Sequence, residues 1–593
     1  LMPFLTRCLL LVFAAVGPGL FAADRPARPN VVVFLADDAG WGDFSFSGNP
    51  QVQTPHIDAI ARSGVAFERF YVQPVCSPTR AEFLTGRYHP RGGVRGVSTG
   101  EERLDLDERT LAEAFRAAGY ATGLFGKWHN GSQWPYHPMA RGFDEFFGYT
   151  SGHWGEYMNA LLEHNGSLVR TQGYIVDVCT DRAMDFIARS RDRPFFCFVP
   201  FTTPHSPWRV PDEDWARFKD RELTARATEP AREEADLTRC ALAMMENQDR
   251  NVGRILRQLE DLGLAENTLV VYFSDNGPNS FRWNGGLRAR KGSTDEGGVR
   301  VPLYVRWPAA LPAGHTVREI AGAIDLLPTL TALAGVPRVD DRPLDGRDLT
   351  PLLRGEAGAW ADRPLFAAWN RAVSVRTQRH VLDAQGRLYD LMADPGQTTP
   401  INAGAPDVVA RLADAVAAWR REMYGDAGAP AAADPRPLPV GYREFPVTML
   451  PARDGEGKGG VKRSTAAPNS SFFVNWTSVD DRIEWPVTVE TTGRYAVTID
   501  YTCPIPDAGA TIELSFGTAR LRGRVEPGWD PPYYTDQDTL PRPPIESPAK
   551  EFRPLALGEI ELTRGAGVLS LRAVDIPGKS VMHLRRLTLT LLP

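Results

Sequence analysis

The chain has 593 residues, of which 43% are hydrophobic and 24% are charged, a composition typical of globular proteins that argues against extensive disorder. This length predicts more than one domain. The formal net charge of -6 lacks the basic excess of a dedicated nucleic-acid binder, so we expect no nucleic acid as a partner. An anionic small substrate is compatible with this charge, because positive side chains can gather locally in a net acidic protein.

The N-terminal residues are typical of a secretory signal. Arg7 precedes an apolar run over residues 9–16, and the small residues Ala22 and Ala23 follow it. This order predicts a signal peptide over residues 1–23 and export to the periplasm or the extracellular space. The apolar run is too short to span a bilayer, and no later segment has about 18 consecutive apolar residues, so we expect no membrane span.

Residues 24–336 alternate apolar runs with helical patterns. The runs expected to form buried strands cover residues 31–36, 121–125, 195–199, 269–273 and 303–305. Three helices are expected. The first has Thr54 as its N-cap and Pro55 as its first residue and ends at Gly64, and the others cover residues 110–118 and about 242–259. Strands that alternate with helices predict an α/β domain with a mostly parallel sheet flanked by helices.

The pattern changes after residue 336. Residues 337–425 predict a small α+β subdomain, with short strands at 372–375 and 380–382 and a helix over about 405–423. Residues 426–440 are rich in Ala, Pro and Gly, which is typical of a linker. From 441 to 593, short segments alternate apolar and polar residues with a period of two, and this pattern predicts an appended all-β sandwich.

Polar residues follow several predicted strands directly. They are Asp37 and Asp38, Lys127 and His129, His205, and Asp275 and Asn276. Because ligand sites form beyond the carboxyl ends of parallel strands, we expect these side chains to meet. Carboxylate and amide oxygens suit Ca²⁺ or Mg²⁺. The lysines and histidines, together with Lys291, suit an anionic ester group.

Cys76 is expected at the beginning of a short helix. Ser77 fits the N-cap, Pro78 the first helical position, and Gly86 the terminating residue. Cys76 would then lie where backbone N–H groups favour anions, with Arg80 near enough to reach the same site. From the residue types alone, Cys76 is either a thiolate nucleophile of lowered pKa or a buried structural cysteine. The cysteines beyond residue 23 are scattered without a CxxC pair, which predicts neither a disulfide framework nor a zinc finger.

The segment from Cys76 to Arg87 resembles the signature of the type I, formylglycine-dependent sulfatases of the alkaline phosphatase superfamily. That signature is Cys-x-Pro-x-Arg followed by Thr-Gly-Arg, and this chain fills every position. The resemblance covers roughly residues 30–423, with further motifs at 37–38, 126–129, 203–205, 275–277, 291–302 and 388–395. It implies an alkaline-phosphatase-like fold. It also implies that a formylglycine-generating enzyme oxidises Cys76 to formylglycine, whose hydrate supplies the attacking oxygen.

The resemblance also implies roles for the site residues. The cation, Ca²⁺ with Mg²⁺ not excluded, would be held by Asp37, Asp38, Cys76, Asp275 and Asn276. Arg80 would orient the hydrate, and Lys127 and Lys291 would bind sulfate oxygens. His205 would protonate or hydrogen-bond the leaving oxygen, while His129 would hydrogen-bond residue 76 and help to expel sulfate. Asn130 and Asp295 stand where relatives more often have Leu and an aromatic residue, and we expect both to shape the substrate pocket.

The expected substrate is a sulfated carbohydrate or another sulfate ester. His153 and Trp154 lie in a loop-like stretch and are candidate substrate contacts, with packing as the alternative. The appended sandwich resembles jelly-roll carbohydrate-binding modules, with a purely stabilising role as the alternative. Its candidate sugar contacts are Trp476, Trp485, Trp529, Tyr533 and Tyr534. Two other functions stay open: a phosphoesterase of the same superfamily, and a catalytically silent glycan-binding protein if Cys76 is not matured.

Overall fold

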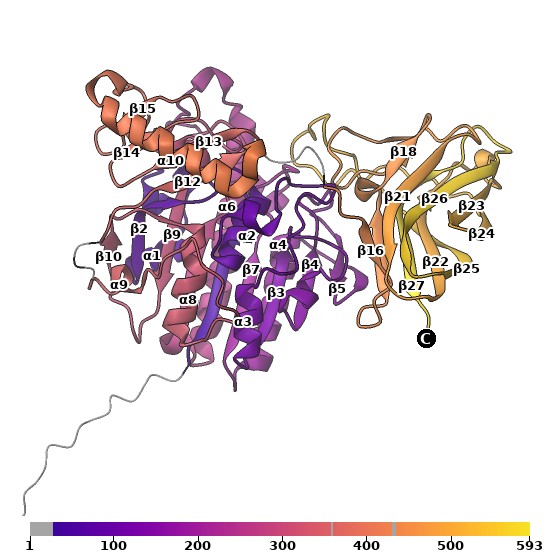
Figure 1. The fold of residues 1–593 in the computed structure, drawn as a ribbon, viewed down its shortest axis with the longest axis horizontal. Coiled ribbons are helices and arrows are strands. Elements are labelled where there is room, and N and C mark those ends of the chain that lie inside the picture. Colours follow the sequence, from indigo (N-terminus) through magenta and orange to yellow (C-terminus); the bar gives the residue numbers. More distant parts are fainter. Residues whose placement is uncertain (1–27, 357, 359, 430–433) are drawn as a thin grey trace, which may run out of the picture.

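The computed structural model describes residues 28–356, 358, 360–429 and 434–593 (Figure 1). The predicted signal peptide, residues 1–23, lies outside these residues, as does part of the predicted linker, residues 430–433. An α/β body contains the main sheet, and a β-sandwich, orange to yellow in Figure 1, lies beside its β4–β5 edge. Among the described residues, no helix combines the length and the apolar character needed to cross a bilayer.

The main sheet has the strand order β10-β2-β9-β8-β1-β7-β3-β4-β5-β6, with β11 beside β2. Its strands are β1 (Asn30–Ala36), β2 (Val65–Tyr71), β3 (Ala121–Lys127), β4 (Glu145–Tyr149), β5 (Leu161–His164), β6 (Ser167–Arg170), β7 (Phe195–Pro200), β8 (Thr268–Ser274), β9 (Arg300–Arg306), β10 (His315–Val317) and β11 (Ala321–Gly322). The central block β8-β1-β7-β3-β4 is parallel, while β9 runs antiparallel to both of its neighbours. The carboxyl ends of the parallel strands therefore share one edge of the sheet.

Helices cover both faces of this sheet. They are α1 (Pro55–Arg62), α2 (Cys76–Thr85), α3 (Leu111–Ala117), α4 (Ile175–Ser190), α5 (Asp212–Phe218), α6 (Ala235–Asp261), α7 (Glu296–Val299), α8 (Leu326–Ala334) and α9 (Thr350–Leu353). Every residue of β1 is buried, and alternate residues enter different cores. Val32 and Phe34 pack in the core that α4 and α6 cover, and Val33 packs in the core that α2, α3 and α8 cover. This two-sided burial explains why the strands are continuous apolar runs.

The helix that carries Cys76 begins two positions earlier than predicted. Cys76 is itself the first helical residue, after the extended Val75. Thr79, not Ser77, organises the start of this helix, because Thr79 Oγ1 accepts a hydrogen bond from Gln73 N at 2.8 Å. The prediction for the other end is confirmed, since the helix terminates at Gly86 with φ 68° in the left-handed region.

The small subdomain has an antiparallel sheet of β12 (Leu365–Trp369), β13 (Ala372–Arg376), β14 (His380–Leu382) and β15 (Leu388–Asp390). Helix α10 (Pro406–Tyr424) packs on it, in agreement with the predicted strands and helix. Together with the main sheet and the sandwich, this confirms the predicted fold class. The boundaries 24–336, 337–425, 426–440 and 441–593 stay our proposal for the domains.

The described residues from 434 onward form two facing β-sheets. One has the order β16-β21-β26-β23-β24 with β18 beside β21, and the other has β19-β20-β27-β22-β25 with β17 beside β27. The strands are β16 (Leu438–Val440), β17 (Val447–Pro451), β18 (Glu456–Lys458), β19 (Lys462–Arg463), β20 (Phe473–Val474), β21 (Arg482–Val489), β22 (Gly493–Thr502), β23 (Thr511–Phe516), β24 (Ala519–Arg524), β25 (Arg553–Leu562), β26 (Gly565–Asp575) and β27 (His583–Leu591). β16 falls inside the predicted linker because its backbone pairs with β21.

The core of the sandwich contains two of its candidate sugar contacts. Trp476 and Trp485 are 1% and 0% exposed and belong to the hydrophobic cluster between the sheets. Neither ring can stack on a sugar, so this part of the prediction was wrong. Tyr533 is exposed, but Lys550 lies over its ring.

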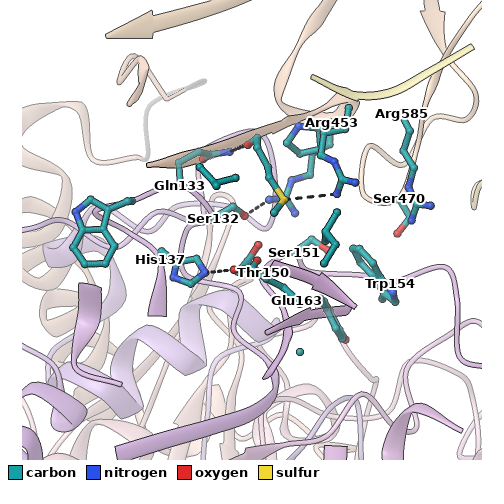
Figure 2. A pocket seen from close by; sticks show the side chains of 18 of the residues that line it. Ser132, Gln133, His137, Thr150, Ser151, Trp154, Glu163, Arg453, Ser470 and Arg585 are labelled. Atoms are coloured by element: carbon teal, nitrogen blue, oxygen red, sulfur yellow. Dashed lines mark hydrogen bonds and ion pairs between the residues drawn. The ribbon is translucent and has the colours of Figure 1, made fainter. Parts of the chain in front are cut away.

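A pocket lies between the α/β body and the sandwich (Figure 2). It is a cavity of about 100 Å³. Trp154, Thr150 and His137 line it from the α/β body, and Arg453 and Arg585 line it from the sandwich. The sandwich therefore contributes side chains to a cavity that it shares with the α/β body.

Candidate active site

Acidic side chains lie where β1 and β8 end. The last residues of these strands, Ala36 and Ser274, are partners in the parallel register. Asp37 and Asp275 follow them directly, and Asp38 N donates a hydrogen bond to Asp275 Oδ1 at 3.1 Å. Asp38 has φ 70°, a left-handed conformation that is uncommon for residues other than glycine.

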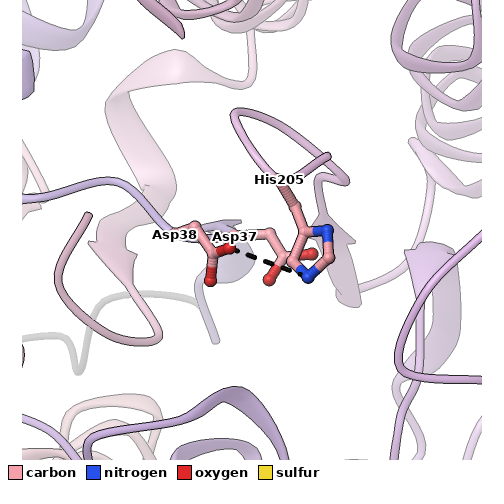
Figure 3. A group of neighbouring side chains, drawn as sticks. All are labelled: Asp37, Asp38 and His205. Atoms are coloured by element: carbon pink, nitrogen blue, oxygen red, sulfur yellow. Dashed lines mark ion pairs between the residues drawn. The ribbon is translucent and has the colours of Figure 1, made fainter. Parts of the chain in front are cut away.

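Side chains from β1, β8 and α2 converge at this edge. One possible ligand atom from each of Asp37, Cys76 and Asp275 lies within 4.8 Å of the others, and all three residues are buried. Asp37 and Asp38 form a second group of this kind with His205 (Figure 3). Carboxylate-rich groups are the usual binding sites of hard divalent cations.

Two buried oxygen atoms at this edge of the sheet lack hydrogen-bond partners among the described residues. Asn276 Nδ2 donates a hydrogen bond to Asp38 Oδ1 at 2.8 Å. Asp38 Oδ2 and Asn276 Oδ1 are also buried, yet they have no hydrogen-bond partner among the described residues. Buried polar atoms normally have a partner, and such oxygens are the ligands that Ca²⁺ and Mg²⁺ prefer. The residues present therefore fit a divalent cation with oxygen ligands.

Two lysines pair with the carboxylates. Lys127 Nζ lies 3.0 and 2.8 Å from the two oxygens of Asp37. Lys291 Nζ lies 2.6 Å from Asp38 Oδ1. Burial by itself raises the pKa of Asp38, but Lys291 and His205 outweigh it and hold that pKa well below its ordinary value. The carboxylate of Asp38 is therefore kept ionised by its cationic neighbours.

Arg80 is fixed against Asp275. Its Nε and Nη2 donate to the same oxygen, Asp275 Oδ2, at 3.1 and 2.8 Å. Its Nη1 donates to the backbone oxygen of Lys127 at 2.9 Å. Burial and the neighbouring Asp37 raise the pKa of Asp275 to about 6, against the effect of Arg80. These bonds hold a buried positive charge in one place beside Cys76.

Cys76 is 3% exposed at the N-terminus of α2. Lys291 Nζ lies 3.7 Å from its Sγ. Burial raises the pKa of the Cys76 thiol to about 11, and Lys127 and Lys291 oppose this only in part. Burial therefore favours the neutral thiol, which speaks against the interpretation of Cys76 as a thiolate of lowered pKa.

The structure brings His205 into the site more directly than His129. His205 Nε2 lies 3.7 Å from Asp38 Oδ2, and its Nδ1 lies 2.7 Å from the backbone oxygen of Ser206. Burial lowers the pKa of His205 to about 4, although Asp38 opposes this. His129 Nε2 lies 2.8 Å from the backbone oxygen of Val97, and its Nδ1 is buried without a hydrogen-bond partner among the described residues. The ring of His129 is therefore not bonded to the thiol at position 76.

The two candidate substrate contacts, His153 and Trp154, lie in different places. The ring of His153 lies 5.4 Å from that of His205, so His153 borders the site. Trp154 instead stacks on Tyr149 at 5.4 Å and lines the pocket towards the sandwich. Glu546 of the sandwich lies 3.7 Å from His153 Nε2, a contact that no sequence pattern indicated.

Other residues support the site without having been predicted to do so. Arg282 is buried, pairs with Asp43 and donates to the backbone oxygen of Asp38 at 2.9 Å. It thereby supports the left-handed turn of Asp38. Asn130, which was expected to shape the substrate pocket, donates to the backbone oxygen of Ser77 at 3.2 Å and so braces the start of α2. Nothing around Arg282 in the sequence resembles a motif, because it lies in an irregular loop after β8.

The mostly parallel sheet, with its carboxylate site at the strand ends and Cys76 at a helix N-terminus, defines a hydrolase with the alkaline phosphatase superfamily fold. The Sulfatase family model matches residues 29–336, and the chain belongs to this family. It is 35% identical over 394 residues to N-acetylgalactosamine-6-sulfatase of Canis lupus familiaris, covering 60% of this chain and 71% of the relative. It is 36% identical over 392 residues to arylsulfatase A of Homo sapiens, covering 59% and 71%.

A solved structure agrees with this assignment. The crystal structure of Ps i-CgsB in complex with k-i-k-neocarrahexaose has a TM-score of 0.62 and 29% sequence identity, and the match covers 68% of this chain and 95% of that one. The chain is therefore an arylsulfatase-like hydrolase of sulfate esters. The catalytic roles of its individual residues stay predictions.

Proposed function

We propose that this sulfatase releases inorganic sulfate from sulfated glycans, with formylglycine at position 76 and a divalent cation in the carboxylate site. The observation that carries the proposal is the position of Cys76, which lies buried at a helix N-terminus within 4.8 Å of Asp37 and Asp275 ligand atoms. A neutral buried thiol is a poor nucleophile, so a modified residue accounts better for this placement.

The cation, Ca²⁺ with Mg²⁺ as the alternative, would bind Asp37, Asp38, Cys76 as modified, Asp275 and Asn276. When bound, it would act as a Lewis acid on a sulfate oxygen and favour the ionised form of the attacking group. The hydrated aldehyde would supply the attacking oxygen and allow sulfate to leave without hydrolysis of a stable enzyme ester.

Basic side chains around position 76 would bind and orient the sulfate ester. Lys291 reaches within 3.7 Å of position 76, so its ammonium group can contact sulfate held there. Lys127 and Arg80 add positive charge that is already fixed before substrate binds, which favours the charge distribution of the transition state. His205 Nε2 is directed towards the same carboxylates and is the group placed to serve the leaving oxygen.

The pocket beside the sandwich supports a glycan as the substrate. Arg453 Nη1, Arg586 Nε and Trp154 Nε1 belong to its lining residues, are buried, and have no hydrogen-bond partner among the described residues. Aromatic rings with unpaired donors suit the hydroxyl and sulfate oxygens of a sugar chain.

The experiment measures sulfate release by the full chain, made together with a formylglycine-generating enzyme. The substrates are 4-methylumbelliferyl sulfate, N-acetylgalactosamine 6-sulfate and a carrageenan oligosaccharide, with the Cys76→Ala variant as the control. We expect release from a saccharide that depends on Cys76. Release from the aryl ester alone would count against the glycan, and phosphate-ester hydrolysis that survives Cys76→Ala would favour a phosphoesterase.

We also propose that the protein is exported, on the basis of residues 1–23 alone. N-terminal sequencing of the protein recovered outside the cytoplasm tests this proposal. A mature chain that begins near Asp24 is expected, and retention of the whole segment in the cytoplasm would contradict it.

A further inference from the structure

A long segment of the sandwich lies against the catalytic side of the α/β body. We call this segment, which covers residues 525–552 between β24 and β25, the docking loop. Gln537 Oε1 accepts a hydrogen bond from Tyr157 N at 2.9 Å. Arg542 Nη2 donates to the backbone oxygen of Gly155 at 2.9 Å. The docking loop is therefore bonded to the stretch that also carries His153.

Glu546 of the docking loop places a carboxylate beside the histidines of the site. Its Oε1 accepts a hydrogen bond from Ser206 Oγ. Its Oε2 lies 3.7 Å from His153 Nε2, too far for a hydrogen bond. Glu546 Oε2 and His153 Nε2 are both buried, and neither has a hydrogen-bond partner among the described residues. A carboxylate that is only 11% exposed is thus held between Ser206 and His153.

Ser206 connects Glu546 to His205. Ser206 Oγ lies 3.5 Å from His205 Nδ1, and the backbone oxygen of Ser206 lies 2.7 Å from the same nitrogen. These contacts occupy the Nδ1 edge of the ring and leave Nε2 directed towards Asp38 (Figure 3). The ring of His153 lies 5.4 Å from the ring of His205 and is tilted against it by 45°. Glu546 fixes the hydroxyl of Ser206 and faces His153, so it contacts both groups that hold this ring.

We propose that Glu546, supplied by the appended sandwich, is a positioning residue that keeps His205 Nε2 directed at the leaving oxygen. This inference rests on the proposed function. In the step concerned, the attacking oxygen at position 76 forms a bond to sulfur while the bond between sulfur and the bridging oxygen breaks, and the electron pair of the broken bond goes to the bridging oxygen. His205 gives the bridging oxygen its Nε2 proton. Because Nδ1–H is bonded to the backbone oxygen of Ser206, this donation requires the ring protonated on both nitrogens, the form that Asp38 and the anionic ester beside it favour. Proton transfer of this kind needs a donor held within hydrogen-bond reach of the oxygen, and a ring free to turn would lose that alignment.

The test compares aryl sulfates whose leaving phenols differ in acidity. A strongly acidic phenol leaves without a proton, whereas a weakly acidic one depends on the donor. We expect Glu546→Ala to lower kcat for esters of weakly acidic phenols by about 10- to 100-fold, a part of the roughly 10²- to 10⁴-fold that general acid catalysis contributes, and to leave the most acidic ester almost unchanged. The Glu546→Gln variant, which keeps an acceptor for Ser206, should recover part of the loss. Glu551→Ala, at an exposed position of the same loop, is the matched control and should behave like the wild type.

Different results separate this inference from the proposed function. An equal loss for all esters, or no loss, with Glu546→Ala would overturn the positioning role. If that variant does not fold, Ser206→Ala removes the same connection without a change in the sandwich. A loss of kcat confined to esters of weakly acidic phenols in Ser206→Ala would then support the positioning role, and an equal loss for all esters would overturn it. Failure of the wild type to cleave any sulfate ester, or activity that survives Cys76→Ala, would instead overturn the proposed function.

Discussion

The pH dependence of stability at Asp249 is a direct consequence of its position. Asp249 lies on α6 and is 2% exposed. Its Oδ1 accepts hydrogen bonds from His56 N at 3.0 Å and from Ile57 N at 2.8 Å, so it caps the beginning of α1 from a distant part of the chain. Burial raises the pKa of Asp249 to about 7, outweighing these backbone bonds, and Asp58 raises it further.

The size and sign of the effect follow from linkage. A rise in the pKa of this carboxyl from its ordinary value of 3.8 to about 7 in the folded state corresponds to about 4 kcal/mol, at about 1.4 kcal/mol for each factor of ten. Because the folded pKa is the higher one, the stabilising contribution is complete below about pH 4 and is lost as the pH rises through 7. The Asp249→Asn variant keeps a carbonyl acceptor for both N–H groups but cannot ionise. It should equal the wild type near pH 4 and exceed it by up to about 4 kcal/mol at pH 8.

Urea unfolding between pH 4 and pH 8 measures this difference. The exposed Asp236, on the same helix, provides the matched control, and Asp236→Asn should change stability by less than about 0.5 kcal/mol. A difference between Asp249→Asn and the wild type that does not vary with pH would refute the reasoning. So would an Asn variant that is less stable than the wild type at pH 8.

Three further predictions concern the site. Removal of divalent cations with EDTA should stop sulfate release and lower the melting temperature, and added Ca²⁺ should restore both; an unaffected enzyme would contradict a metal role. The Arg80→Met variant should lose about 3–5 kcal/mol in urea unfolding, because Asp275 is left buried without its partner, and a loss below about 1 kcal/mol would contradict this. In Gly277→Ala, the new Cβ would overlap the backbone oxygen of Gly297 and displace Asn276, so more Ca²⁺ should be needed for half-maximal activity; an unchanged requirement would contradict it.

The strands and the clustering of carboxylates at the candidate metal site were predictable because burial leaves a simple pattern. A strand that is buried on both faces must be a continuous apolar run, as β1 and β8 are. The polar residues that end such a run are then conspicuous, and the parallel register places Asp37 and Asp275 at one edge. The start of α2 was predicted less well, since the side chain of Thr79, which bonds to Gln73 and Asp275, decides it.

For one aromatic residue of the sandwich, the period-two pattern itself predicts burial. On β21, Trp485 has the same parity as Ile483 and Val487, and all three side chains are buried. A tryptophan in register with aliphatic neighbours belongs to the core, and this argument could have excluded it as a sugar contact. Trp476 has no such neighbours on a strand, so its burial was not predictable in this way.

The contribution of the sandwich to the catalytic side was not predictable from the sequence. Glu546 and Ser206 are 340 residues apart, and Glu546 lies in an irregular loop without periodicity or motif. Contacts of this kind depend on how the two bodies pack against each other, and local sequence carries no signal for that packing. Arg282 was missed because it lies in an irregular loop after β8 without a motif, from which it bonds to the backbone of Asp38.

The central claim is that position 76 becomes formylglycine in the active enzyme. The most direct test is mass spectrometry of the peptide that carries this position, taken from protein that releases sulfate. We expect the mass of formylglycine there, in a fraction of the molecules that rises with specific activity. An unmodified cysteine in fully active protein would contradict the account and remove the proposed nucleophile.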